Sequence, residues 1–564
     1  MKISVRGLCR RNAPSRRSLR LLLGETGCFS RHATVPVDPG RERSQRIEGH
    51  YRQRSEAERL ARAGRSACAA CLCVLLSACA VGPDFVRPAP PSVQSYTETE
   101  TPEALAPGSG EPEQHFALGQ EISTEWWQLF RSPQLTDAVQ QAIAGNQTLA
   151  LAEATLAQAQ DALVQARAAF YPQIDAAASA TRQQPSSSGS PSTSTSAFNL
   201  FSLGPSVSYA PDVFGGTRRS VEQKAALAES QDYQLAAAYL TLTGNVVTQA
   251  ITVAGVRLQI KATEELIADD EKNLSLVRTE FDAGKAARTD VLSAESQLAN
   301  DRALLPPLRQ QLSAARHAFS ILIGKFPAEW SPPDFELADL TLPGELPVRL
   351  PSELVHQRPD ILAAETTLHA ASAAIGVATA QLYPSITLSA SVGQEATTTG
   401  ALFDSASTVW NLTSGLTAPI FHGGALEAQK QAAIDAYRGS LATYRQTVLQ
   451  AFGQVADTLE ALAYDADLVA AERHALDVAD ASLALQRISY TAGKSSVLQL
   501  LDSERLDQQA RLGYARALSQ RYQDTTQLFV ATGGPWWDAA ARSEAISGMK
   551  GPTLLRNESP PASR

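Results

Sequence analysis

AEATLAQAQDALVQARAAFYP, residues 152–172, aligns without gaps to AETTLHAASAAIGVATAQLYP, residues 364–384, at an offset of 212 residues. The two stretches share Ala-Glu, Thr-Leu, four further alanines and the closing Tyr-Pro. The first stretch is rich in alanine and has no Pro or Gly before Pro172, whose ring cannot continue a helix. The pattern therefore predicts a helix that ends at Pro172, and its second copy indicates an internal repeat.

The repeat extends through three further motifs at a nearly constant offset. Gly215-Gly216 matches Gly423-Gly424, FDAGKAARTDVLSAE (281–295) matches YTAGKSSVLQLLDSE (490–504), and Gly324 matches Gly533, at offsets of 208, 209 and 209 residues. Alanine-rich helices align with one another by chance, but chance similarity does not preserve the offset through such different motifs. We therefore predict two copies of one unit, at 123–330 and 349–534.

Proline spacing predicts unusually long helices in both copies. No proline occurs between Pro211 and Pro306 or between Pro419 and Pro535. Gly284 and Gly493 divide these gaps into outgoing and returning helices. An outgoing helix of about 65 residues would extend about 100 Å, which indicates a projecting coiled structure rather than a globule. Pro306-Pro307 predicts a break in the first returning helix.

Two strands are predicted in each copy between the first helix and the long one. In the first copy they lie in QIDAAASATRQ and FNLFSLGPSVSYAPDVFGG, on either side of the polar stretch 185–196. In the second copy one strand covers 385–393, and we place Trp410 and Phe421 on the other. Four strands cannot close a barrel, and unpaired edges are excluded in lipid. The strands must lie in water or be completed by other chains, and three chains would supply twelve.

The charge distribution excludes nucleic-acid binding. The chain has 564 residues, 44% of them apolar and 19% charged, with a formal net charge of −9. Residues 1–65 carry sixteen basic and six acidic side chains, which leaves 33 Lys and Arg against 52 Asp and Glu from residue 66 onward. An acidic body lacks the basic face that phosphate binding requires.

The cysteines point to export and lipidation. All six lie within the first 79 residues, so the rest of the chain has no disulfide scaffold. Arg62 and Arg65 precede the uncharged run 67–78, which has the length of a signal-peptide apolar region. The run ends Leu76-Ser77-Ala78-Cys79, which resembles a lipobox and predicts N-acyl and S-diacylglycerol lipid on Cys79. Ala80 after the cysteine implies transport to the outer membrane.

The remaining segments outside the repeat are predicted to be irregular. Residues 1–78 are read as a lipoprotein signal peptide preceded by a misassigned N-terminal extension, and a genuine Arg-rich extension is the alternative. Residues 79–122 are rich in Pro, Glu, Thr and Ser and read as a lipidated extended tether. Residues 535–564 read as a disordered tail.

In this order the motifs are typical of a known family. GPDFVRP (82–88), WWQLFRSPQL (126–135), YAPDVFGG (209–216), AGKAARTDVLSAESQL (283–298) and PIFHGG (419–424) are among them. The chain resembles the TolC-like outer-membrane factors of RND-type tripartite efflux systems, in their NodT/OprM-like lipoprotein branch. The resemblance implies a mainly α homotrimer whose small β part forms a twelve-stranded outer-membrane barrel, continued by a periplasmic α-helical barrel. It also implies a passive exit duct fed by an inner-membrane pump through a periplasmic adaptor.

The resemblance also implies two functional sites. The adaptor would dock at the hairpin tips, Gly284, Lys285, Gly493 and Lys494, although the family usually has an apolar residue after each glycine. C-capping glycines followed by a lysine that faces the last carbonyls explain both tips equally well. A periplasmic gate would comprise Asp290, Tyr490, Leu498, Asp502 and Arg505. Gln499 stands where some relatives have a second aspartate, and Asp502 with Arg505 is also an ordinary i,i+3 surface pair.

No motif indicates an enzyme or a metal site. The sequence lacks a Gly-rich phosphate loop, Gly-x-Ser-x-Gly and His-Glu-x-x-His, and its histidines are scattered without ligand spacing. We therefore predict no enzymatic activity and no cofactor apart from the lipid. A duct for protein secretion and a pore-less, lipid-anchored periplasmic scaffold stay open as alternatives to small-molecule efflux.

Overall fold

The structure is a computed structural model that describes residues 80–93, 95–98, 113–120, 122–184 and 196–533. Every described residue belongs to one unit of the chain, Cys79–Arg564. The predicted signal peptide, Cys79 and the tail at 535–564 lie outside the described residues.

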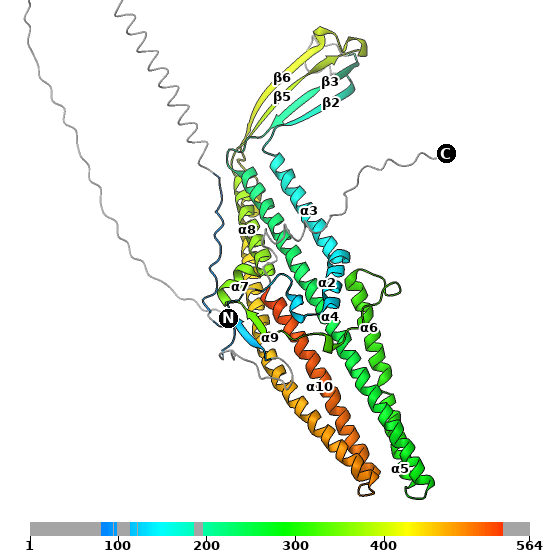
Figure 1. Cartoon of the computed structure of the whole chain (residues 1–564). Helices are drawn as coiled ribbons and strands as arrows, with labels where there is room; N and C mark the ends of the chain where they lie inside the picture. Colours follow the sequence, from blue (N-terminus) through cyan, green and yellow to red (C-terminus); the bar gives the residue numbers. More distant parts are fainter. Residues whose placement is uncertain (1–79, 94, 99–112, 121, 185–195, 534–564) are drawn as a thin grey trace, which may run out of the picture. The chain divides into compact units, whose positions relative to one another are not determined.

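The first repeat follows the predicted order of elements (Figure 1). Its helices α2 and α3 precede two strands, and a helix of 67 residues leads to the turn at Gly284. The break expected at Pro306-Pro307 is present, because one returning helix ends at Arg302 and the next begins at Leu305. The elements are η1 (Trp126–Phe130), α2 (Pro133–Gly145), α3 (Gln147–Ala168), β2 (Gln173–Gln183), β3 (Phe198–Tyr209), α4 (Gly216–Asp282), α5 (Arg288–Arg302) and α6 (Leu305–Ile323).

The second repeat has the same order, but its returning helix is continuous because no proline interrupts it. Its outgoing helix, α9, is 67 residues long, the same length as α4. The elements are η2 (Leu337–Asp339), β4 (Glu345–Val348), α7 (Pro351–Gln357), α8 (Pro359–Ala380), β5 (Ser385–Ala396), η3 (Thr399–Ala401), η4 (Ser405–Ser407), β6 (Thr408–Thr417), α9 (Ala425–Thr491) and α10 (Val497–Thr532). The predicted duplicated fold is thereby confirmed.

The four predicted strands form one antiparallel sheet in the order β2-β3-β5-β6. Strands β2 and β6 are its edges, and every residue of both is exposed. The placement of Phe421 on the fourth strand was wrong. The strand ends at Thr417, and Pro419 follows it, which interrupts strand pairing.

A second sheet, which was not predicted from the sequence, has two strands. Strand β1 (His115–Leu118), within the segment predicted as a tether, pairs in parallel with β4. Each strand is only four residues long, too short to show a clear alternation. Phe116 is 6% exposed and Leu346 fully buried, so burial against the helices stabilises this small sheet.

The main core lies where the short elements at the start of each repeat pack against the long helices. Trp126, Trp127 and Phe130 of η1 are almost completely buried, and the Trp126 ring stacks on Phe529 of α10 at 5.3 Å. Helix α8 is long and apolar enough to cross a membrane, but 67% of its apolar window is buried inside the unit. That burial is typical of a core helix.

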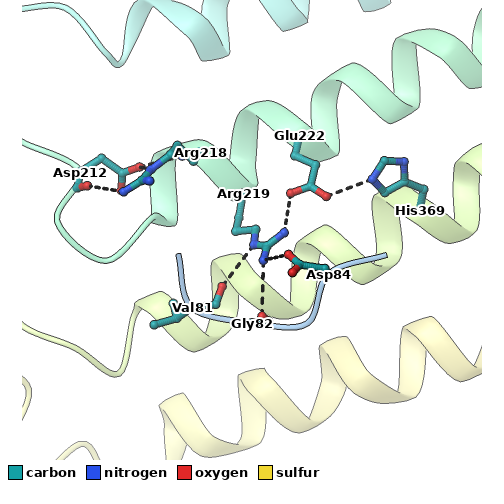
Figure 2. Close-up of polar contacts among 8 residues, drawn as sticks. All are labelled: Val81, Gly82, Asp84, Asp212, Arg218, Arg219, Glu222 and His369. Atoms are coloured by element: carbon teal, nitrogen blue, oxygen red, sulfur yellow. Dashed lines mark hydrogen bonds and ion pairs between the residues drawn. The ribbon is translucent and has the colours of Figure 1, made fainter. Parts of the chain in front are cut away.

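Residues 80–93, named here the strap, are extended but not a free tether, because they dock on α4 and α8 (Figure 2). The buried guanidinium of Arg219 donates to Asp84 at 2.6 Å and to Glu222 at 2.7 Å, and it also reaches the carbonyls of Val81 and Gly82. His369 bonds to Glu222 at 3.0 Å. The site at Arg219 therefore fixes the start of the strap next to the junction between β3 and α4.

Candidate functional site

The two Gly-Lys tips are closed by backbone hydrogen bonds that require a left-handed glycine. Gly284 has φ 72° and Gly493 has φ 71°. The amide of Lys285 donates to the carbonyl of Glu280 at 2.8 Å, and that of Lys494 to Ser489 at 2.9 Å. Bonds of this span satisfy the last carbonyls of a helix. Both lysine side chains are exposed, so they are available to a partner, and adaptor docking stays a prediction.

The returning helices begin with equivalent caps in the two repeats. Asp290 accepts a hydrogen bond from the amide of Ala287 at 2.9 Å, and Gln499 accepts one from the amide of Ser496 at the same distance. The Ser496 hydroxyl accepts in turn from the amide of Gln499, which completes a capping box. The carboxylate of Asp290 thus caps α5, and Gln499 performs the same task on α10 without a charge.

A small apolar core joins the ends of the four helices near the tips, separate from the main core. Its residues come from all four helices: Ile267, Leu274 and Val277 of α4, Val291, Ala294 and Leu298 of α5, Leu483 and Tyr490 of α9, and Val497 and Leu500 of α10. The two hairpins, α4 with α5 and α9 with α10, are therefore packed on each other within one chain. We call this region the hairpin ends.

Polar bonds also cross between the two hairpins. The hydroxyl of Tyr490 donates to Glu280 at 2.5 Å, and burial followed by that bond raises the pKa of the tyrosine. Three more bonds cross the interface: Arg487 to Asp269 at 2.7 Å, Gln508 to Asp301 at 2.9 Å, and Asn273 to Glu504. The bond from Tyr490 to Glu280 supports the predicted place of Tyr490 between the hairpins.

Within each hairpin, ion pairs recur at the repeat offset of 209 residues. Arg278 pairs with Glu295 at 2.8 Å, and their counterparts Arg487 and Glu504 are 3.7 Å apart. A second set links outgoing and returning helices one step further from the tips: Arg302 with Glu271 at 2.5 Å, and Arg511 with Asp480. The duplication thus preserved the ion pairs within each hairpin as well as its fold.

The other predicted gate residues lie on the exposed face of α10. Leu498 is 62% exposed. Arg505 donates to Asp502 at 2.8 Å, and both side chains are about half exposed. No other hydrogen bond or ion pair to a described residue holds this pair in place, so within one chain it is an ordinary surface pair. Its gate role stays a prediction that requires a neighbouring copy.

Several buried polar residues were not predicted from the sequence, although a signal was present. Asp270, Asp301 and Glu504 are each at most 3% exposed. Each lies three or four residues after a buried apolar residue of the same helix: Asp270 after Ile267, Asp301 after Leu298, and Glu504 after Leu500. A carboxylate at such a position of an apolar helical stripe is unusual and marks a buried polar contact. Among the described residues, no cluster of His, Cys, Asp and Glu is suited to a metal ion.

Comparison with known proteins agrees with this geometry. The model of the outer membrane efflux protein family matches residues 138–325 and 350–534. The chain is 31% identical over 446 residues to the pyoverdine export outer membrane protein OpmQ of Pseudomonas aeruginosa, covering 77% of this chain and 94% of that protein. It is 30% identical over 474 residues to nodulation protein T of Rhizobium leguminosarum, covering 83% and 92%.

Solved structures show the same fold. The outer-membrane channel OprN superposes with a TM-score of 0.72 at 27% identity, covering 81% of this chain and all of that one. The fold is thus that of the TolC-like outer-membrane channels, as the resemblance in sequence implied.

Proposed function

Since this chain belongs to the outer membrane efflux protein family, we propose that three copies assemble into one passive exit duct, supplied by an inner-membrane pump through a periplasmic adaptor. The homologues are outer-membrane components of efflux systems, and this chain is likewise an outer-membrane efflux channel. The trimer, its partners, the gate and the lipid are the proposed parts.

The observation that carries the proposal is the two-faced sheet. In the pairing register one face is mainly apolar, and its side chains include Trp410, Leu412 and Leu416 of β6, Val392 and Leu388 of β5, Val207 and Leu203 of β3, and Ile174 of β2. Its polar residues are Ser414 and, toward the end of the sheet at the β2-β3 and β5-β6 loops, Thr408, Gln394, Asn199 and Arg182. Trp410, Leu412 and Ile174 are each more than 70% exposed. The other face is mainly polar, with Ser and Thr at about half of its positions, such as Ser389 and Thr413. A sheet of this kind is stable with lipid on one side and water on the other.

Both edges of the sheet lack a neighbour among the described residues, which a membrane does not permit. The strands are 10 to 12 residues long, close to the 9 to 11 residues that a tilted strand needs to cross a bilayer. Pairing β6 of one copy with β2 of the next removes both edges once three copies close. Four strands from each copy then give the twelve-stranded barrel, with the polar face inside.

The strap supports lipidation at Cys79. Ala80 lies against Gly215, where an added Cβ would be 2.7 Å from the Ala80 Cα. Gly215 immediately precedes α4, six residues after β3 ends. Ala80 is therefore held at the junction between the sheet and the helices. Acyl chains on Cys79 would enter the same membrane as the strands, and several chains anchor a protein firmly.

For the gate, we propose that three copies bring Leu498, Asp502 and Arg505 together around the pore axis. Their exposure in the single chain leaves them free to meet their counterparts. Asp502→Ala would remove one charged ring and its arginine pairing, so closed-state conductance should rise, and cells should become sensitive to large antibiotics. An unchanged conductance would refute this assignment.

The function is tested by isolating the mature protein from outer-membrane fractions and recording current in planar bilayers. A duct predicts heat-resistant trimers and discrete conductance steps. Monomers that mild detergent or high salt releases without conductance would favour the pore-less scaffold. A deletion strain that becomes susceptible to small toxic compounds while its secreted proteins are unchanged would favour efflux over protein secretion.

A further inference from the structure

A layer of charged side chains crosses the hairpin ends next to their apolar core. Each of the four helices contributes one residue: Asp270 from α4, Asp301 from α5, Arg487 from α9 and Glu504 from α10. The three carboxyl groups are 2%, 3% and 0% exposed. We call this set the carboxyl layer. It contains three acids and one base, so it is neutral only if two of the acids hold a proton, and one of the acids has no hydrogen-bond donor.

Hydrogen bonds show which acid that is. Asp301 accepts from the amides of Gln508 at 2.9 Å and Gln297 at 2.7 Å. Glu504 accepts from Asn273 and lies 3.7 Å from the Arg487 guanidinium. Neither oxygen of Asp270 receives a hydrogen bond from any described residue.

An ionised carboxylate buried without a donor is strongly unfavourable, whereas a protonated one can donate to the oxygen of a neighbouring acid. Burial, and then the neighbouring carboxyl group of Asp301, raises the pKa of Asp270 to about 8. Burial also raises the pKa of Glu504 to about 7, although Arg487 and Asn273 oppose that rise. The packed hairpins therefore hold a proton at Asp270 at neutral pH.

We propose that the carboxyl layer is a proton-operated latch, which holds the two hairpins of each chain together while Asp270 is protonated and releases them as the pH rises. The proposal rests on the proposed function in one respect, because it takes separation of the hairpins as the movement that opens the duct. The groups that face Asp270 are Asp301 of α5, Glu504 of α10 and Asp269 on its own helix, and all three are acids. Arg487 of α9, the cation of the layer, is engaged by Asp269 and Glu504.

The direction follows from proton linkage. When the hairpins separate, water reaches Asp270, its pKa returns toward the ordinary value of about 4, and the proton is released. Opening is therefore favoured by high pH. Between these two pKa values the opening equilibrium should rise by up to about tenfold per pH unit, and the rise should stop above pH 8.

Hydrogen–deuterium exchange on the purified full mature protein tests the latch at pH 6, 7, 8 and 9. Peptides from 266–302 and 483–508 report the hairpin ends. Asp270→Asn replaces the protonated acid with a permanent donor of the same shape. The ratio of wild-type to variant exchange at each pH cancels the intrinsic dependence of amide exchange on pH. Asp465→Asn is the matched control, because Asp465 is another buried acid with a raised pKa but lies between α9 and α10 of one hairpin.

The latch predicts that this ratio rises at least about tenfold between pH 6 and pH 8 at the hairpin ends. Asp301→Asn, which removes one acid from the layer, should flatten the wild-type rise in the same peptides, so either variant suffices if the other does not fold. The Asp465→Asn protein should retain the wild-type rise. A ratio that does not change with pH, or an equal flattening in Asp465→Asn, would overturn the proposal. Because exchange is measured without current, a chain that fails to conduct can still show the latch, and a conducting chain can lack it.

Discussion

Replacing Tyr490 by Phe removes one hydroxyl at the interface between the hairpins and leaves the ring in its place. The ring is 6% exposed and belongs to the apolar core of the hairpin ends, so packing should be unchanged. The lost interaction is the 2.5 Å bond to Glu280. We expect Tyr490→Phe to increase the fraction of channels whose hairpins are apart.

The size of the shift toward separated hairpins depends on whether water can solvate Glu280 once the Tyr490 hydroxyl is removed. A hydrogen bond to a charged acceptor contributes about 1.5 to 3 kcal/mol. Glu280 is half-buried, so water can replace the hydroxyl, and the lower limit applies. About 1.5 kcal/mol corresponds to roughly a tenfold shift of the equilibrium toward separated hairpins in each chain.

The assay is the open probability of single channels in planar bilayers, with sensitivity to large antibiotics as the cellular counterpart. Tyr233→Phe is the control, because its hydroxyl also bonds to a glutamate, Glu229, but within the single helix α4. Tyr490→Phe should raise the open probability severalfold while Tyr233→Phe leaves it unchanged. Equal open probabilities for the two variants would refute a role of the Tyr490 bond in holding the hairpins together.

Three further changes test other parts of the structure. Leu412→Lys places a charge on the apolar face near the middle of β6, where it costs about 2 to 4 kcal/mol in a bilayer, so the amount of trimer in outer membranes should fall. Thr413→Lys on the polar face should leave that amount unchanged. Arg219→Met removes the charged bonds that hold the strap, so exchange of residues 80–93 should accelerate about tenfold or more, and Arg218→Met, whose partner is the neighbouring Asp212, should not change it. Burial and then Asp524 raise the pKa of Asp465 to about 7, so stability should fall as the pH rises toward 7, and the melting temperature of Asp465→Asn should fall less between pH 5 and pH 8.

The repeat made most of the fold predictable. Once Tyr171-Pro172 was matched with Tyr383-Pro384, and the two Gly-Lys turns with each other, every large element had a counterpart that confirmed its type. Proline spacing predicted the lengths of α4 and α9, because helix length depends on local chemistry that the sequence displays directly. Strands β1 and β4 were missed because their pairing partners are about 230 residues apart and neither strand is long enough to show alternation.

The site was less predictable, for a physical reason. The tips and caps are local, so Gly284, Gly493 and Asp290 could be located from their neighbours in the chain. The carboxyl layer depends on which helices meet, and Asp270 and Asp301 approach only after both helices of the hairpin pack. A polar residue in an apolar stripe shows that such a contact exists, but it does not identify the partner.

The central claim is that the polar face of the sheet lines a pore and the apolar face meets lipid. All six cysteines precede residue 80. In the proposed mature protein only Cys79 remains and lipid blocks its sulfur, so a new cysteine in the sheet can be labelled selectively. Thr413→Cys and Leu412→Cys place thiols on opposite faces of β6 at adjacent positions. A charged, membrane-impermeant thiol reagent should reduce the single-channel current of the Thr413→Cys protein and leave that of Leu412→Cys unchanged. Equal block at both positions, or block only at Leu412→Cys, would contradict the account.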